Sequence, residues 1–304
     1  MTAAHHGHSH GVSAETDAGR LSIALGLIVA FMVGEIAAGI LAGSLALLSD
    51  AAHMLTDAVA LGLSVGALRL AARPARGQMT FGFRRVEILS AQFNGATLLV
   101  LALLIVFGAI ERLVSPPSVA GTPVVAVALA GVVVNLAAAG VLSRANRQSL
   151  NVEGAFQHIV TDLAGFVLTA VAGAVILTTG FVRADGIASL LIAAIMLRAA
   201  YGLLRASGRV FLEAAPEGVD VQSIGRAMVS VPGVSEVHDL HVWEVSSGFP
   251  ALSAHVLVGT DDDCHVARRQ LEELLVERFQ IEHTTLQVEH EDVHLLTIDR
   301  APGS

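Results

Sequence analysis

A chain of 304 residues with 54% hydrophobic and 15% charged residues is not an ordinary soluble globule, because soluble domains carry roughly a quarter charged residues. The formal net charge of −9 is uneven, with many acidic residues after residue 210, which indicates two domains and argues against a nucleic-acid partner. The single cysteine, Cys264, excludes an internal disulfide framework and a site made of several thiolates. Any transition-metal site must therefore use imidazole and carboxylate groups.

The N-terminal segment is polar and rich in histidine, and it lacks the basic, apolar and small-residue regions of a cleaved signal peptide. Its histidines are His5, His6, His8 and His10. We expect residues 1–20 to form a flexible tail, and the first apolar run to stay as a membrane helix. The histidine cluster either collects metal or belongs to a flexible tail that has no role in metal binding.

Six apolar runs before residue 210 reach the length of about 20 residues that crosses a hydrocarbon core of ~30 Å. They cover residues 21–43, 45–70, 87–112, 122–143, 154–180 and 185–206. Breaker and turn residues separate them. We therefore predict a polytopic α-helical membrane domain over residues 21–210, with an even number of spans and both termini on one side.

The arginines of the short loops predict which side the termini occupy. Ten arginines belong to the side of the termini: Arg20, Arg69, Arg73, Arg76, Arg84, Arg85, Arg144, Arg147, Arg205 and Arg209. Only Arg112 and Arg183 fall on the other side. Because basic loops stay in the cytoplasm, both termini are expected to be cytoplasmic.

Residues 211–304 follow the pattern of a small soluble domain. Amphipathic helices are predicted at 219–231 and 261–279, and strands at 234–246, 251–259 and 284–291. The order α-β-β-α-β predicts an α+β fold in which helices cover a sheet.

Ionisable residues interrupt the second apolar run at Asp50, His53 and Asp57. Such groups cost several kcal/mol inside a bilayer unless they pair or face a polar cavity, so they indicate a functional site. His53 and Asp57 are four residues apart and therefore share one helical face. The fifth run repeats the same His-x-x-Thr-Asp pattern at His158 and Asp162.

Two such helices side by side would supply two nitrogen and two oxygen ligands, which is a tetrahedral set that Zn²⁺ accepts. One pair alone could simply hold two helices together, but two pairs at identical spacing favour a metal site. Other polar residues of the apolar runs either line an ion path or form interhelical hydrogen bonds. They are Glu35, Asp50, Asn94, Asn135 and Asp185.

Five motifs, spread over nearly the whole chain, resemble the cation diffusion facilitator family, and in particular its zinc-transporting branch of the bacterial zinc, cobalt and cadmium efflux type. They are residues 44–57 (SLALLSDAAHMLTD), 81–90 (FGFRRVEILS), 149–158 (SLNVEGAFQH) continuing to Asp162, 185–190 (DGIASL) and 238–243 (HDLHVW). Together they are far more specific than any one of them.

The resemblance implies a homodimer with six transmembrane helices and a cytoplasmic ferredoxin-like domain, which exchanges metal for protons by alternating access. It also implies that His53, Asp57, His158 and Asp162 form the transport site. Histidine at position 53, where other branches have aspartate, implies a preference for Zn²⁺ over Cd²⁺ or Mn²⁺.

A second metal site is implied in the cytoplasmic domain, where four residues match zinc-binding positions of the family. They are His238, His255, His290 and Asp292, and His265 could join them. This site would tune transport or stabilise the domain; alternatively, these side chains are simply solvated. His241, His283 and His294 are expected to be bystanders.

The family often carries a basic–acidic interlock near the membrane surface, and Arg84 or Arg85 with Glu213 would match it. The chain departs from the family pattern in two loops. Residues 71–83 contain no histidine or aspartate, and residues 143–151 contain no histidine, so neither loop is expected to bind zinc.

Metal ligation needs neutral imidazole and ionised carboxylate, so Zn²⁺ and protons would compete for the same four side chains. An intramembrane zinc hydrolase would need an open coordination position and a general base, and no His-Glu-x-x-His motif occurs within the six apolar runs. A metal sensor would not need two ionisable pairs inside the membrane. We therefore expect a secondary transporter of Zn²⁺ in a bacterial inner membrane. We expect neither an enzymatic activity nor a cofactor.

Overall fold

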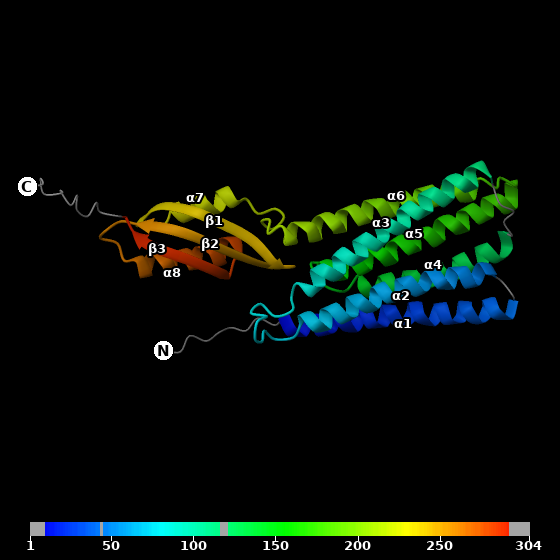
Figure 1. Ribbon diagram of the computed structural model, residues 1–304, viewed down its shortest axis with the longest axis horizontal. Coiled ribbons are helices and arrows are strands. Elements are labelled where there is room, and N and C mark those ends of the chain that lie inside the picture. The colour runs from blue at the N-terminus through cyan, green and yellow to red at the C-terminus, as the bar shows by residue number, and fades with distance from the viewer. Residues whose placement is uncertain (1–9, 43–44, 116–120, 292–304) are drawn as a thin grey trace, which may run out of the picture. The chain divides into compact units, whose positions relative to one another are not determined.

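A computed structural model describes residues 10–42, 45–115 and 121–291. Its chain divides into two compact units, Met1–Gly208 and Arg209–Ser304. The first unit consists of long helices that lie lengthwise beside one another (Figure 1). They are α1 (His10–Ala42), α2 (Leu45–Ala71), α3 (Val86–Val114), α4 (Gly121–Leu142), α5 (Leu150–Thr179) and α6 (Ala184–Phe211), the last of which runs on into the second unit.

Five helical segments among the described residues are long and apolar enough to cross a membrane. They are Thr16–Ala37, Val86–Val114, Val125–Leu142, Leu150–Thr179 and Ala184–Phe211. Large apolar side chains such as Leu104 and Phe107 on α3 are exposed, which suits contact with lipid. α2 has a comparable length, and it is the helix that contains the ionisable residues of the second apolar run.

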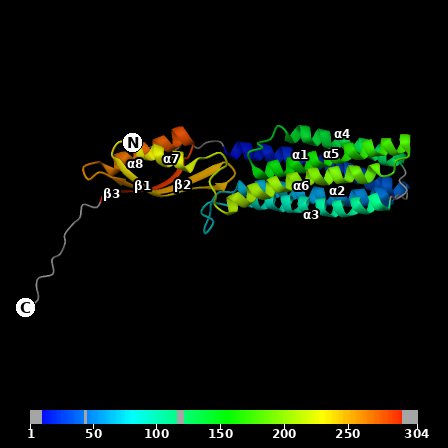
Figure 2. The same cartoon turned by 90° about the horizontal axis from the view of Figure 1, so that it is seen from above.

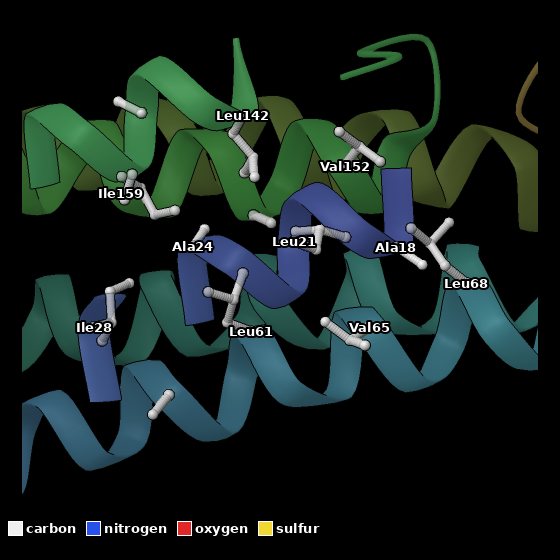
Figure 3. Close-up of a cluster of buried hydrophobic side chains, with 14 of the residues drawn as sticks. Ala18, Leu21, Ala24, Ile28, Leu61, Val65, Leu68, Leu142, Val152 and Ile159 are labelled. Atoms are coloured by element: carbon white, nitrogen blue, oxygen red, sulfur yellow. The ribbon is translucent and has the colours of Figure 1, made fainter. Parts of the chain in front are cut away.

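The helices of the first unit pack in two groups. Residues of α1, α2, α4 and α5 share one buried cluster, in which Leu21, Leu61, Leu142 and Ile159 point toward one another (Figure 3). A second buried cluster joins α3 to α6 through Leu98 and Ala102 on one helix and Met196 and Ala200 on the other. Polar side chains, described below, connect α3 of the second group to α2 of the first.

α1 begins at His10, eleven residues earlier than the sequence indicated, so the expected flexible tail of residues 1–20 is helical from His10 onward. Asp17 is buried there and accepts hydrogen bonds from Arg20 Nη1 at 3.0 Å and from the backbone N–H of Asn146 at 3.1 Å. These bonds hold the polar start of α1 against the connection between α4 and α5. His5, His6 and His8 lie outside the described residues.

The second unit contains α7 (Val221–Val229), β1 (Val234–Ser246), β2 (Phe249–Val258), α8 (Cys264–Phe279) and β3 (His283–His290), in the expected order α-β-β-α-β. The sheet has the order β1-β2-β3, with β1 antiparallel and β3 parallel to β2. Figure 2 shows α7 and α8 over one face of the sheet. Ile224, Met228, Leu271 and Leu275 pack there against alternate residues of β2, such as Val256.

Candidate metal site in the membrane helices

α2 and α5 run antiparallel, and they bring Asp57 against His158. The distance from His158 Nε2 to Asp57 Oδ1 is 2.8 Å, and each residue is only 5% exposed. A second contact supports this alignment of the two helices. Ser64 lies seven residues after Asp57 on α2, and Asn151 lies seven residues before His158 on α5. The Ser64 carbonyl accepts a hydrogen bond of 2.7 Å from Asn151 Nδ2. The two contacts together define how α2 and α5 are aligned.

Asp162 lies one turn beyond His158 on α5, and its Oδ2 is 3.7 Å from His158 Nε2. One ligand atom from each of Asp57, His158 and Asp162 lies within 4.8 Å of the other two. A divalent cation with bonds of about 2.0–2.2 Å to nitrogen and oxygen can be held by atoms at such separations. Three of the four residues that the sequence predicted are therefore together.

His53 lies in α2 one turn before Asp57, but its side chain is not among those that the structure describes, and the same holds for Asp50. The position of His53 on the backbone of α2 places it on the face that carries Asp57, since residues four apart share a helical face. Its role as the fourth ligand remains a prediction.

Three other polar residues of the apolar runs make hydrogen bonds or ion pairs with the protein. Asp185 pairs with Arg112 at 2.5 Å and joins α6 to α3. Asn135 donates to the Gly131 carbonyl of its own helix, and Asn94 donates to Ser64 Oγ across α3 and α2. Glu35 of α1 is also buried. These contacts support the interhelical or local bonding alternative for Asn94, Asn135 and Asp185.

In the second unit, His238, Asp239 and His255 form a further group of close ligand atoms. His238 and His255 are directly opposite each other on β1 and β2, and their ring centroids are 5.4 Å apart. Asp239 was not predicted from the sequence. It lies at an irregularity of β1 with a φ of 48°, a conformation that aspartate tolerates better than most residues, and it follows a histidine directly.

Of the other predicted ligands of this domain, His265 and His290 are not part of that group. His290 is on β3, where its Nε2 contacts the Asp262 carbonyl at 2.9 Å. His265 is in the first turn of α8, after the N-cap Asp263. Asp292 and the bystander His294 lie outside the described residues. Of the other expected bystanders, His283 packs against Phe249 with a centroid distance of 5.5 Å, and His241 pairs with Ser253 in the sheet register.

The predicted interlock of Arg84 or Arg85 with Glu213 would join residues of the two separate units. Arg85 is the residue before α3, and Glu213 follows α6 with a φ of 54°. The interlock remains a prediction.

A buried group of imidazole and carboxylate side chains between apolar helices, followed by a small α/β domain, is typical of membrane proteins that move ions. The chain matches the "Cation efflux transmembrane domain" over residues 21–212 and the "Cation efflux protein, cytoplasmic domain" over residues 216–291. It therefore belongs to the cation efflux family, as its motifs predicted, and it is an integral membrane protein with a small α/β cytoplasmic domain.

Several bacterial relatives match almost the full chain. The "Metal cation efflux system protein CzcD" of Cupriavidus metallidurans is 39% identical, over 93% of this chain and 90% of the relative. The "Zinc transporter ZitB" of Escherichia coli is 38% identical, over 95% and 94%. The "Cadmium, cobalt and zinc/H(+)-K(+) antiporter" of Bacillus subtilis is 37% identical, over 94% and 92%.

Proposed function

We propose that this protein is a zinc efflux transporter that exchanges cytoplasmic Zn²⁺ for protons by alternating access. In this proposal, His53, Asp57, His158 and Asp162 hold the ion as a tetrahedral set of two nitrogens and two oxygens. α2 is the sixth membrane span, and the protein is a secondary transporter rather than an enzyme. The names of its relatives as zinc transporters, cation efflux proteins and a proton-coupled antiporter support this proposal.

The observation that carries the proposal is the buried contact between Asp57 and His158, with Asp162 one turn away. Two carboxylates and an imidazole are costly inside a bilayer, and a purely structural pair would need only one of each. A third ligating group at the same point is explained by a bound cation. The absence of a thiolate at the predicted site argues against Cu⁺, because the single cysteine, Cys264, is in α8 of the other domain.

The geometry also supports coupling to protons. A hydrogen bond of 2.8 Å between His158 Nε2 and a carboxylate oxygen of Asp57 requires a proton between the two atoms. A metal ion needs the same nitrogen lone pair and the same oxygen, so it can bind only after that proton leaves. The site then holds either metal or proton, and exposing it alternately to the two sides of the membrane exchanges one for the other.

The arginine-rich loops favour cytoplasmic termini and, for a bacterial chain, an inner-membrane location. The cytoplasmic domain is proposed to mediate a homodimer and to bind further Zn²⁺ at His238 and His255, with Asp239 as an additional ligand. His265, His290 and Asp292 remain candidate ligands of this second site, which would regulate transport or stabilise the domain. Arg84 or Arg85 with Glu213 would link it to the membrane helices.

The test is Zn²⁺ uptake into sealed proteoliposomes driven by a pH step. Wild-type protein should transport Zn²⁺, while Asp57→Asn and Asp162→Asn should reduce uptake to the level of empty vesicles. Asp185→Asn is the matched control, because it removes a carboxylate that pairs with Arg112 at a helix end. A metal sensor or an intramembrane hydrolase would give no uptake with any variant, and that result would refute the proposal.

A further inference from the structure

Two turns from the Asp57–His158 contact, toward the loops 72–85 and 143–149, a second group of buried polar side chains joins three helices. Ser64 of α2 is 0% exposed, Asn94 of α3 is 2% exposed and Asn151 of α5 is 0% exposed. Seven residues of helix separate this group from the metal site on both α2 and α5, which corresponds to about 10 Å. Since Asn151 is the second residue of α5, the group lies where the helices begin to meet those loops.

Ser64 is the centre of this group. Its Oγ accepts a hydrogen bond of 3.0 Å from Asn94 Nδ2, and its carbonyl accepts one of 2.7 Å from Asn151 Nδ2. Its hydroxyl also lies 3.1 Å from the Ala60 carbonyl and 3.5 Å from Ser90 Oγ. A serine hydroxyl that bonds to the carbonyl four residues earlier commonly bends a helix and weakens it locally. α2 is therefore tied to two neighbours at a point where it is easily bent.

The hydrogen bond from Asn94 to Ser64 also crosses between the two packing groups of the membrane unit, whereas the bond from Asn151 holds Ser64 within the first group. α2 and α5 belong to the first apolar cluster, whereas α3 belongs to the cluster that it shares with α6. Polar contacts across such a boundary can be exchanged for water when the groups separate, while each apolar cluster stays intact. The side-chain oxygens of Asn94 and Asn151 accept no hydrogen bond from the described residues, although both are buried. Such acceptors favour an open state in which water or a passing cation reaches them.

We infer that Ser64, Asn94 and Asn151 form a hydrogen-bonded gate that closes the loop side of the metal site. The gate rests on the proposed transport function, since it controls access to the proposed ion site. In the closed state all three residues are shielded from solvent, and the path from the loops to Asp57 and His158 is blocked. Opening breaks the bonds to Ser64 and leaves amide oxygens that replace part of the hydration of an arriving ion.

The gate can be tested by the reactivity of a reporter thiol between the gate and the metal site. Ala60 is buried on α2 between Asp57 and Ser64 and belongs to neither apolar cluster, so Ala60→Cys in a Cys264→Ser background supplies one thiol there. Purified full-length protein in metal-free buffer is treated with a charged methanethiosulfonate reagent. Asn94→Ala and Asn151→Ala should speed this reaction about three- to tenfold, the effect of one lost hydrogen bond on a two-state equilibrium.

Asn135→Ala is the matched control, because Asn135 is also a buried amide, and among the described residues its side chain bonds to Gly131 of its own helix, α4. It should leave the reaction rate within about twofold of the parent protein, although it also removes one hydrogen bond. Ser64→Ala removes only a hydroxyl and tests the gate if an asparagine variant does not fold. Unchanged rates in the gate variants, or equal acceleration by Asn135→Ala, would overturn the gate.

Because the labelling needs no transport, its result is independent of the proposed function. If wild-type protein carries no Zn²⁺ but the gate variants react faster, the transport proposal fails and the gate stands. If wild-type protein carries Zn²⁺ and the variants react at the parental rate, only the gate fails. Zn²⁺ affinity at the membrane site should be retained in the gate variants, since all four proposed ligands are unchanged.

Discussion

Asp57 and His158 meet inside a helical bundle, where an isolated charge on either residue would be costly. The contact makes the pair neutral overall, either as a carboxylate with a protonated imidazole or as two neutral groups. Bringing a divalent cation to this point requires the second carboxylate, Asp162, to compensate its charge. The residue types at the site therefore match a doubly charged ion better than a single proton.

His53→Asp tests the origin of metal selectivity. Replacing an imidazole by a carboxylate adds an oxygen ligand and a negative charge, which suits cations that prefer oxygen or a higher coordination number than Zn²⁺. The ratio of Cd²⁺ or Mn²⁺ uptake to Zn²⁺ uptake should be about tenfold or more higher in the variant than in the wild type. A tenfold change in this ratio corresponds to only about 1.4 kcal/mol.

The measurement is initial uptake of Zn²⁺, Cd²⁺, Co²⁺ and Mn²⁺ into proteoliposomes at equal metal concentrations. Thr56→Ser, which changes the residue before Asp57 in the sequence and keeps a hydroxyl, serves as the control and should preserve the wild-type order. An unchanged ratio of Zn²⁺ to Cd²⁺ uptake in His53→Asp would show that position 53 does not set selectivity.

The sequence predicted the proximity of Asp57, His158 and Asp162 because ionisable groups inside apolar runs are costly unless they meet partners, and here they repeat at identical helical spacing. It did not predict Ser64 and Asn151 as partners. Serine and asparagine are tolerated in membrane helices wherever a neighbouring carbonyl is available, so their presence alone does not say which helix they face. Asp239 was missed because its proximity to His255 depends on a local irregularity of β1.

At the scale of elements, α4 and α5 pack closely at Gly131. A Cβ atom at this position would lie 2.5 Å from ring atoms of Phe166. Phe166 is confined on another side by Phe31 of α1, at a centroid distance of 6.3 Å. The ring has little room to move away, so the absence of a side chain at Gly131 is required by the packing.

Gly131→Ala should therefore destabilise the membrane unit by about 1–3 kcal/mol, the usual cost of overpacking. Gly140→Ala in the same helix is the control, because a Cβ atom added there would meet no heavy atom within 4 Å. Thermal unfolding of detergent-purified protein should show a lower Tm for Gly131→Ala and no decrease for Gly140→Ala. Equal Tm values would contradict the packing described for α4 and α5.

The N-terminus of α8 makes a pH-dependent contribution to the stability of the cytoplasmic domain. Backbone N–H groups of His265 and Val266 donate to Asp263 Oδ1 at 2.8 and 3.2 Å, and these bonds hold the pKa of Asp263 below its ordinary value. Because the pKa of Asp263 is lower in the folded state, its stabilising contribution is complete at pH values above the ordinary pKa of aspartate. It is lost as the pH falls through the lower folded-state pKa.

Asp263→Asn keeps a capping oxygen but does not titrate. The stability of α8, measured by amide hydrogen exchange in the full-length protein, should fall more steeply in the wild type than in Asp263→Asn as the pH decreases below about 4. Above neutral pH the wild type should be the more stable of the two, since a carboxylate accepts stronger hydrogen bonds at a helix N-terminus. Parallel pH profiles would show that the cap does not titrate in this range.

The lengths of the apolar runs and the amphipathic patterns predicted the existence and order of the long helices and of the α-β-β-α-β domain. Helix starts were less predictable. α5 begins at Leu150 rather than at 154, because Ser149 accepts a hydrogen bond from the N–H of Val152 and Asn151 is buried against α2. The faces on which membrane helices meet were not predictable, since lipid is as apolar as leucine and gives no contrast in the sequence.

On the scale of the whole molecule, polar contacts at both ends of the helices stabilise the membrane unit. Asp17 bonds to the connection between α4 and α5 at one end, and Arg112 pairs with Asp185 at the other. Between these ends, Asp57, His158 and Asp162 lie close together inside the bundle. The proposed gate of Ser64, Asn94 and Asn151 lies between them and the loops 72–85 and 143–149. This arrangement suits a carrier with a central ion site whose access changes while its apolar clusters stay intact.

The most direct test of metal–proton exchange follows protons rather than metal. Proteoliposomes with equal pH on both sides and a pH indicator inside are given a Zn²⁺ gradient as the only driving force. Wild-type protein should move protons against the direction of Zn²⁺ movement, and His158→Ala should abolish both fluxes. Zn²⁺ movement without any proton movement, or full coupling in His158→Ala, would contradict the claim that metal and protons compete for one site.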